Sequence, residues 1–205
     1  RGKRKPAGAQ ADAHAGHRPI SFPSPGGQAG SMTSDAPHFG SRHDGDHPDR
    51  ADEWAALREK HLRPASERPA STGGGVHHQA LISSDLERTI DFYQGLLEFP
   101  LTDLFQNRDY EGSTHFFFDI GNGNCIAFFD FPGLGLGPYQ EVLGGHHHLA
   151  ISISPDHWER LKGKLDDAGV PYWEHKTSIY FTGPDGERLE LLAEPLGQMY
   201  GSRVL

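Results

Sequence analysis

The sequence predicts an α+β fold in which one unit, a strand followed by a helix and three more strands, occurs twice. Two segments with apolar residues at helical spacing, 85–97 and 155–168, each follow a strand-like run, and each precedes further strand-like runs. In both halves, a turn containing Asn-Gly or Asp-Gly separates the last two strand-like runs. A repeated order of elements indicates a duplicated module.

The repeated part begins where the amino-acid composition of the chain changes. Residues 1–75 are rich in Gly, Pro, Ser, Ala and His and hold few periodic apolar residues, so burial cannot offset the entropy cost of ordering them. We expect this tail to be mostly disordered, with at most a short helix at 50–62. One compact domain should then span 76–195, followed by a C-terminal tail at 196–205.

The first module is expected over 76–131. Its opening strand is 76–83, and its helix is 85–97, which carries apolar residues three to four positions apart. The Gly-Asn-Gly-Asn turn at 121–124 is typical of a hairpin. It joins the last two of three strands, which we expect at 100–108, 113–120 and 125–131.

The second module is expected over 146–195, after a glycine-rich loop at 131–145. Its opening strand, 146–154, starts with three consecutive histidines, and its helix is 155–168. Three strands should follow, at 171–175, 178–182 and 188–193, with a Pro-Asp-Gly turn between the last two.

The two turns give a register between the modules. Counting outward from them, Glu190 matches Ala127, and Tyr180 matches Phe117. In a β-hairpin, two residues at equal distances before and after the turn lie opposite each other, on the same face of the sheet. We therefore expect the Tyr180 and Glu190 side chains to be neighbours.

Charge and cysteine content exclude several classes of protein. The formal net charge of −9 disfavours binding to nucleic acid, because a phosphate backbone repels an acidic surface. The single cysteine, Cys125, excludes an intrachain disulfide and fits the cytoplasm. No apolar run approaches the roughly 18 residues that a membrane-spanning helix needs. The expected partner is a small-molecule substrate.

Three motifs resemble those of the vicinal oxygen chelate superfamily, which includes glyoxalase I, extradiol dioxygenases, fosfomycin-resistance enzymes and bleomycin-resistance proteins. They are the stretch from His78 to Tyr93, the His-Leu-Ala-Ile-Ser-Ile run at 148–153, and the Gly-Pro-Asp-Gly-Glu-Arg-Leu-Glu-Leu run at 183–191. The resemblance covers about 76–195. It implies two βαβββ modules that form a curved mixed sheet around a metal site.

The resemblance also implies metal ligands at matching positions of the two modules. Carried over to this chain, they are His78, His148 and Glu190, while Ala127 stands where a fourth ligand would be. Alanine cannot bind a metal, so a glyoxalase I-like site is disfavoured. His146 shares the predicted strand face with His148 and is the alternative if the strand register differs.

Two imidazoles and one carboxylate suit Fe(II), which we prefer, or Mn(II) or another divalent ion, and they leave positions open for oxygen ligands. This set resembles that of an extradiol-type dioxygenase acting on a small aromatic or vicinal-oxygen substrate. Tyr180 is the expected hydrogen-bond donor or acid/base group, and His115 is the candidate for a second acid/base group.

Two other functions stay open. One is a lyase or thiol transferase of the glyoxalase or fosfomycin type, although Ala80 and Met199 stand where the fosfomycin enzymes carry anion-binding groups. The other is a non-enzymatic protein that binds a small molecule such as an antibiotic. Because each module leaves a strand edge exposed, we expect a homodimer, with modules paired within one chain or swapped between two.

Overall fold

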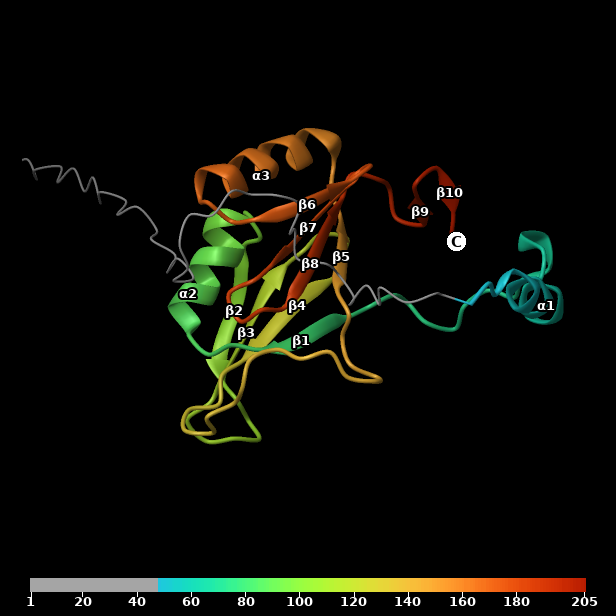
Figure 1. Ribbon diagram of the computed structural model, residues 1–205. Helices are drawn as coiled ribbons and strands as arrows, with labels where there is room; N and C mark the ends of the chain where they lie inside the picture. Colours follow the sequence, from blue (N-terminus) through green and yellow to red (C-terminus); the bar gives the residue numbers. More distant parts are fainter. Residues whose placement is uncertain (1–47) are drawn as a thin grey trace, which may run out of the picture.

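The computed structural model describes residues 48–205. It contains two four-stranded sheets with a helical segment packed on each, as Figure 1 shows. The expectation of a disordered tail falls mostly on residues 1–47, which lie outside the described part of the chain.

The first module has one sheet with the strand order β1-β4-β3-β2. Strand β1 is parallel to β4, and the other neighbours are antiparallel. The chain order is β1 (His78–Ile82), α2 (Leu86–Ile90), the π-helical turn η2 (Asp91–Leu96), β2 (Leu101–Gln106), β3 (Thr114–Asp119) and β4 (Cys125–Phe129). The expected single helix at 85–97 is therefore one helical segment whose second half is widened into a π-helix.

The second module repeats this topology with the strand order β5-β8-β7-β6. Its first strand is again parallel to its last. Its elements are β5 (Leu149–Ser152), α3 (Pro155–Asp167), β6 (Tyr172–His175), β7 (Ser178–Thr182) and β8 (Arg188–Leu192). The predicted α+β fold of two βαβββ modules is confirmed.

The strand register confirms the predicted correspondence between the modules. Tyr180 pairs with Glu190 across β7 and β8, and Phe117 pairs with Ala127 across β3 and β4. One prediction needs correction: the strand expected from residue 146 begins only at Leu149. The reason is that pairing with β8 starts at Leu149, so the three histidines lie in the segment just before the strand.

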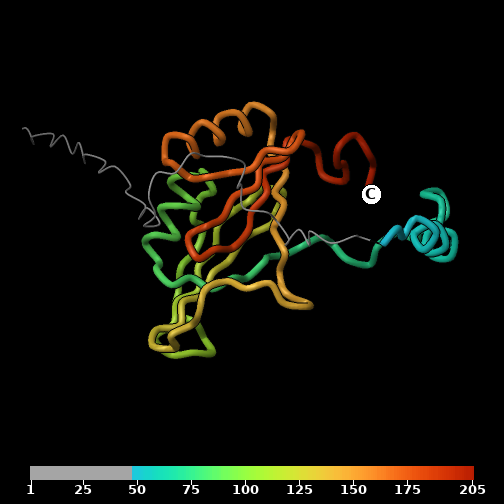
Figure 2. Tube along the Cα trace, in the orientation of Figure 1, coloured from blue at the N-terminus to red at the C-terminus, as the bar shows by residue number. Residues whose placement is uncertain are grey.

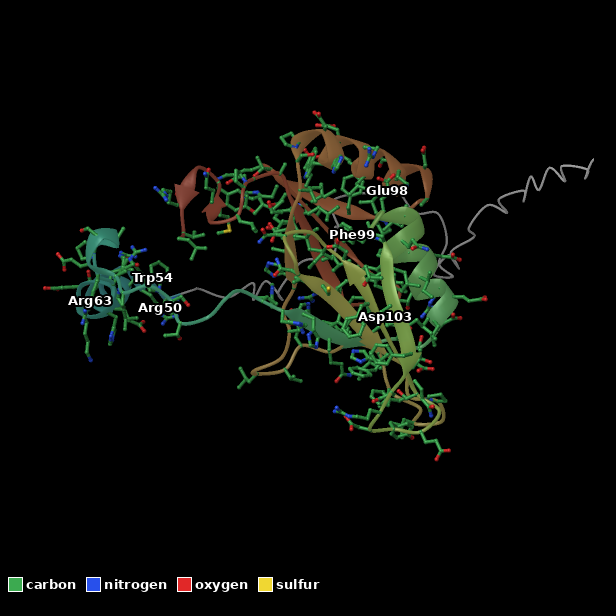
Figure 3. The ribbon with its side chains drawn as sticks, turned by 180° about the vertical axis from the view of Figure 1, so that it is seen from behind. Arg50, Trp54, Arg63, Glu98, Phe99 and Asp103 are labelled. Atoms are coloured by element: carbon green, nitrogen blue, oxygen red, sulfur yellow. The ribbon has the colours of Figure 1, made fainter. Side chains whose placement is uncertain are left out.

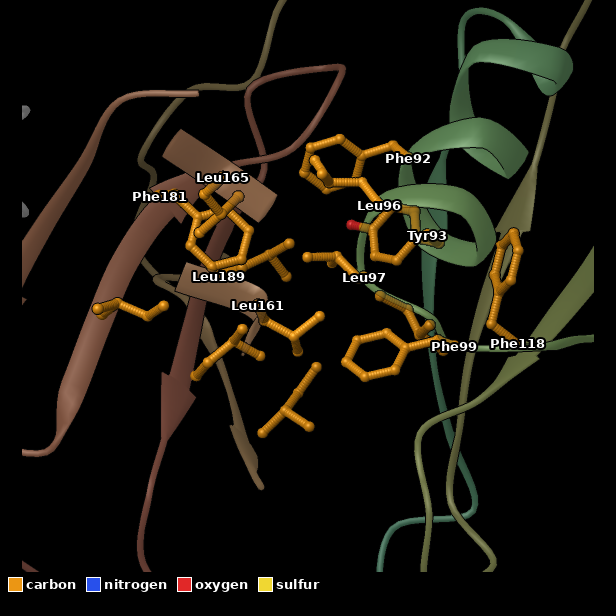
Figure 4. Close-up of a cluster of buried hydrophobic side chains, with 14 of the residues drawn as sticks. Phe92, Tyr93, Leu96, Leu97, Phe99, Phe118, Leu161, Leu165, Phe181 and Leu189 are labelled. Atoms are coloured by element: carbon orange, nitrogen blue, oxygen red, sulfur yellow. The ribbon is translucent and has the colours of Figure 1, made fainter. Parts of the chain in front are cut away.

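The core lies where the helical segment of the first module meets the second module. Figure 4 shows side chains of η2 and the residues just after it facing those of β7, β8 and α3. Its buried members include Phe92, Tyr93, Leu96, Leu97, Leu161, Leu165, Phe181 and Leu189. Leu189 and Leu191 point into this core, so Glu190 between them points to the opposite face of the sheet.

Polar contacts to two acidic residues, one of them buried, hold the modules against each other. The Tyr93 hydroxyl donates a hydrogen bond to Glu187 Oε1 over 2.8 Å. The Arg88 guanidinium contacts Asp185 at 2.7 Å, and the Ser84 backbone N–H donates to the same carboxylate over 3.0 Å. Both acidic residues belong to the β7–β8 turn, so this turn is the contact point between the modules.

The ends of the described chain extend beyond the sheets. Helix α1 (Ala51–His61) and the single 3-10 turn η1 (Ala65–Glu67) precede the first module, and α1 buries none of its residues. Figures 2 and 3 show this arm away from the domain that carries Phe99 and Asp103, with Trp54 on the arm half exposed. At the other end, β9 (Gln198–Met199) and β10 (Ser202–Arg203) form a short hairpin. Among the described residues, no helix is long and apolar enough to cross a membrane.

Candidate metal centre

Glu190 is the centre of a hydrogen-bonded group on the face of the second sheet that points away from the core. Its side chain is nearly fully buried, at 2% exposed. Ser178 Oγ donates a hydrogen bond to Glu190 Oε1 over 2.5 Å, and Tyr180 Oη donates to the same oxygen over 2.8 Å. Strand β7 places these two donors two residues apart, hence on one face, and Tyr180 is the one that pairs with Glu190.

His148 approaches the other carboxylate oxygen. Its Nε2 lies 3.0 Å from Glu190 Oε2, and about a third of its side chain is exposed. Its other ring nitrogen lies 2.6 Å from Nδ1 of His147. The structure therefore brings together His148, Glu190 and Tyr180, three of the predicted site residues.

Hydrogen bonding sets the protonation state of this group. Burial raises the pKa of Glu190, but hydrogen bonds from His148, Ser178 and Tyr180 outweigh burial, and the net pKa lies below the usual range of a glutamate. Burial, with hydrogen bonding to Tyr200 and Glu190, raises the pKa of Tyr180 far above that of a free phenol. Glu190 is thus a carboxylate at neutral pH, and Tyr180 keeps its proton.

The spacing of His148 Nε2 and Glu190 Oε2 also suits a divalent ion that would replace the hydrogen bond between them. Two ligands at right angles around an ion with bonds of about 2.1 Å lie roughly 3.0 Å apart. The observed separation of His148 Nε2 and Glu190 Oε2 is 3.0 Å. A buried carboxylate and an imidazole that meet at this spacing could bind one metal ion as adjacent ligands.

His78 lies on the other sheet. It opens β1, with its ring centroid 5.8 Å from that of Phe117 and 6.4 Å from that of His115. Within residues 48–205 of one chain, no group of three or more His, Cys, Asp or Glu side chains is placed to hold a metal ion. One copy of the chain therefore brings together two of the three predicted ligands, and the third is on the matching face of the first module.

The position of Ala127 agrees with the repeat. Ala127 is fully buried and pairs with Ala80 on β1. At the matching place in the second module, Glu190 pairs with Ala150 on β5. The position that carries the carboxylate of Glu190 in the second module thus carries the methyl group of Ala127 in the first.

His115 is part of an aromatic cluster on the face of the first sheet that carries His78. Its ring stacks on Phe129 at a centroid distance of 3.8 Å, and Phe117 and Phe105 are also in contact. Its Nε2 is buried and has no hydrogen-bond partner within residues 48–205. Burial lowers the pKa of His115, and the nearby His78 adds to this effect, so the imidazole is neutral. Within one chain, His115 and Tyr180 lie on different sheets.

Two residues of the site were absent from the sequence prediction. Ser178 could have been found, because it lies two positions before Tyr180 and so shares its strand face. Tyr200 had no such signal: it belongs to the segment expected as a tail, yet its hydroxyl lies 2.7 Å from that of Tyr180. The same face also carries Trp173, whose ring stacks on Tyr180 at 5.1 Å.

Comparison with known proteins gives one family and several distant relatives. Residues 75–191 match the model of the Glyoxalase/Bleomycin resistance protein/Dioxygenase superfamily. The metallothiol transferase FosB of Lysinibacillus sphaericus is 28% identical over 129 residues, which cover 56% of this chain and 79% of the relative. The putative ring-cleaving dioxygenase MhqA of Bacillus subtilis is 24% identical over 139 residues, which cover 63% of this chain and 43% of the relative.

A solved structure of a putative dioxygenase from Bacillus subtilis has a TM-score of 0.53 and 25% identity, and the match covers 60% of this chain and 41% of that one. A glyoxylase/bleomycin resistance protein/dioxygenase domain from Frankia sp. EAN1pec has a TM-score of 0.51 and 22% identity, with 59% and 98% covered. The chain thus spans less than half of the two dioxygenase relatives. It matches the Frankia domain along almost its whole length, which supports the fold.

Proposed function

The chain belongs to the glyoxalase/bleomycin resistance protein/dioxygenase superfamily, and from this we propose that it is a divalent-metal enzyme with His78, His148 and Glu190 as ligands. We propose Fe(II) as the metal and an extradiol-type dioxygenase reaction on a small aromatic or vicinal-oxygen substrate. The observation that carries the proposal is the buried carboxylate of Glu190, with His148 Nε2 3.0 Å from one oxygen and two hydroxyl donors on the other.

The bound ion would supply a positive centre that polarises two neighbouring substrate oxygens and, as Fe(II), a reductant for O2. The ligands themselves set its charge: one carboxylate and two neutral imidazoles leave a net charge of about one on a divalent ion. A negatively charged substrate oxygen is attracted to such a site.

Tyr180 and the aromatic side chains around it would bind the substrate, Tyr180 through a hydrogen bond and the rings through apolar contact. Since Tyr180 stays protonated, its hydroxyl acts as a donor toward a substrate oxygen, not as a base. Trp173 stacks on Tyr180, with ring planes 29° apart. On the face of His78, the rings of Phe105, His115 and Phe117 present a further apolar surface. Flat apolar walls of this kind favour a ring-shaped substrate and keep water out.

A homodimer would complete the ligand set. His78 is on the first sheet, and the other two proposed ligands belong to the second. Each module also begins with an edge strand: within the described chain, β1 pairs only with β4, and β5 pairs only with β8. Unpaired edges favour association with a second chain. We propose that His78 of one copy faces His148 and Glu190 of another.

Reconstitution tests the dioxygenase proposal. Protein loaded anaerobically with Fe(II) and then exposed to air should consume O2 with at least one member of a panel of catechols. His148→Ala and Glu190→Gln should abolish the uptake, while the exposed His157→Ala serves as the matched control and should retain it. No O2 uptake by the Fe(II)-loaded wild-type protein across the panel would contradict the dioxygenase proposal.

A second candidate is metal-dependent thiol transfer. It is favoured by the similarity to FosB, of which the match covers 79%, and by a cation close to the site, since Lys176 Nζ lies 4.9 Å from the ring centroid of Tyr200. The same protein loaded with Mn(II) should then add glutathione or cysteine to an epoxide such as fosfomycin. Thiol loss with Mn(II), together with no O2 uptake with Fe(II), would select this reaction over the first.

A further inference from the structure

The C-terminal hairpin places a second phenol next to the candidate metal centre. Tyr200, at the tip between β9 and β10, has its hydroxyl 2.7 Å from Tyr180 Oη and 3.1 Å from Ser178 Oγ. Both neighbours donate to Glu190 Oε1. Tyr200 therefore contacts both hydroxyl donors of the carboxylate without contacting the carboxylate itself.

The backbone at this tip is unfavourable for a tyrosine. The register Ser202 with Met199 leaves a two-residue turn, and both turn residues are left-handed, with φ of 52° at Tyr200 and 79° at Gly201. Such a turn favours Asn-Gly, and a bulky side chain at a positive φ is uncommon. A local preference that is overridden next to a candidate site points to a role for the side chain.

Several contacts fix Tyr200 in this position. Its backbone N–H donates to Glu194 Oε1 over 2.8 Å, and Thr177 Oγ1 donates to the same oxygen over 2.8 Å. Lys176 Nζ lies over the Tyr200 ring at 4.9 Å, and the His175 ring stands perpendicular to it at 5.4 Å. Contacts to both the backbone and the ring of Tyr200 thus fix the position of its hydroxyl.

Counting protons shows what the Tyr200 hydroxyl can do there. Each hydroxyl has one proton, and Tyr180 and Ser178 both give theirs to Glu190 Oε1. Each of them can therefore only accept from Tyr200. The single Tyr200 proton lies between these two oxygens, 2.7 and 3.1 Å away, and can serve both only as a shared, three-centre hydrogen bond. Such a shared bond favours the orientation in which both donors point at the carboxylate.

We propose that Tyr200 is a positioning residue of the metal centre, which holds Tyr180 and Ser178 as donors to Glu190 Oε1 and so leaves Oε2 to bind the metal beside His148. This inference rests on the proposed function. It makes the C-terminal hairpin a part of the site and predicts that Glu190 binds through one oxygen.

Three variants test the proposal: Tyr200→Phe, Tyr200→Asn and, as a control on the same hairpin, the exposed Met199→Ala. The readouts are the dissociation constant for Co(II) and the visible absorption spectrum of the Co(II)-loaded full chain. Loss of a group that orients a metal ligand weakens binding roughly 10–100-fold. Tyr200→Phe and Tyr200→Asn should each show such a loss with a changed spectrum, and Met199→Ala should match wild type.

Tyr200→Asn separates positioning from folding. Asparagine suits the left-handed turn, so its thermal unfolding midpoint should equal or exceed that of wild type although its metal affinity falls. Wild-type affinity and an unchanged spectrum in Tyr200→Phe would overturn the proposal.

A metal-free measurement separates this inference from the proposed function. Wild-type protein that binds no Co(II) would overturn the proposed function. The hydroxyl network is then tested by the unfolding midpoints of Tyr180→Phe, Tyr200→Phe and the double variant. Non-additive effects would show that the two hydroxyls act together, and additive effects would refute the network.

Discussion

At the scale of single residues, the Tyr180 hydroxyl is fixed as a hydrogen-bond donor. Burial and a carboxylate partner keep its proton in place, and Glu190 Oε1 accepts this proton over 2.8 Å. A substrate oxygen that comes close to the metal can compete for the same proton. Tyr180 is therefore expected to act in the reaction and not solely in binding.

Replacing Tyr180 by phenylalanine tests this role. With metal at saturating concentration, Tyr180→Phe should lower kcat by roughly 10²-fold, because a positioned proton donor contributes about 10²–10⁴-fold to a rate. The exposed Tyr110→Phe should leave kcat unchanged. Steady-state kinetics on the substrate found in the catechol or thiol screen measure both. A rise in KM with no change in kcat would show that Tyr180 only binds substrate.

At the scale of elements, the β7–β8 turn supports both the site and the contact between modules. Glu187 in this turn accepts hydrogen bonds from Tyr93 Oη and from the backbone N–H of Asp185. A Cβ on Gly183 would lie 2.0 Å from Glu187 Oε1, so glycine leaves the room that this carboxylate occupies. The strand that follows the turn carries Glu190, so the turn also sets the position of this proposed metal ligand.

Glu187 in this turn should make the free energy of unfolding depend on pH. Burial raises the pKa of Glu187 against the lowering effect of its hydrogen bonds. A raised folded-state pKa means that its favourable contribution is complete below about pH 4.3, the unfolded value, and is lost as pH rises through the folded pKa. The difference in unfolding free energy, wild type minus Glu187→Gln, should therefore decrease between pH 4.5 and pH 8. Urea unfolding across this range measures it, and a difference that grows with pH would show that the carboxyl is stabilised in its charged form.

At the scale of the whole molecule, the two modules pack through their helical sides and leave the faces of His78 and Glu190 on different sheets. A site that needs all three ligands then needs a second chain in the proposed arrangement. In that proposed arrangement, the three proposed ligands come from two chains, and one copy gathers two of them.

Mixing two inactive variants tests the shared site. His78→Ala and Glu190→Gln should each be inactive alone, because every site of either homodimer lacks one ligand. After unfolding and refolding together, the mixed dimer has one intact site, so random pairing of equal amounts should restore about a quarter of wild-type activity. Activity assays with size-exclusion chromatography check this result. No recovery from a mixture that forms dimers would show that the three ligands belong to one chain.

The sequence by itself determined the modules and their register, because the two-residue period of strands and the geometry of tight turns are local properties. They give the register in which Tyr180 pairs with Glu190 and Phe117 with Ala127, and the same two-residue period would have put Ser178 on the face of Tyr180. Only the tertiary structure showed where the modules meet. It placed His78 on a separate sheet from Glu190, started β5 after the histidines, and brought Tyr200 from the expected tail to Tyr180. These outcomes depend on packing between segments far apart in sequence, which no local pattern records.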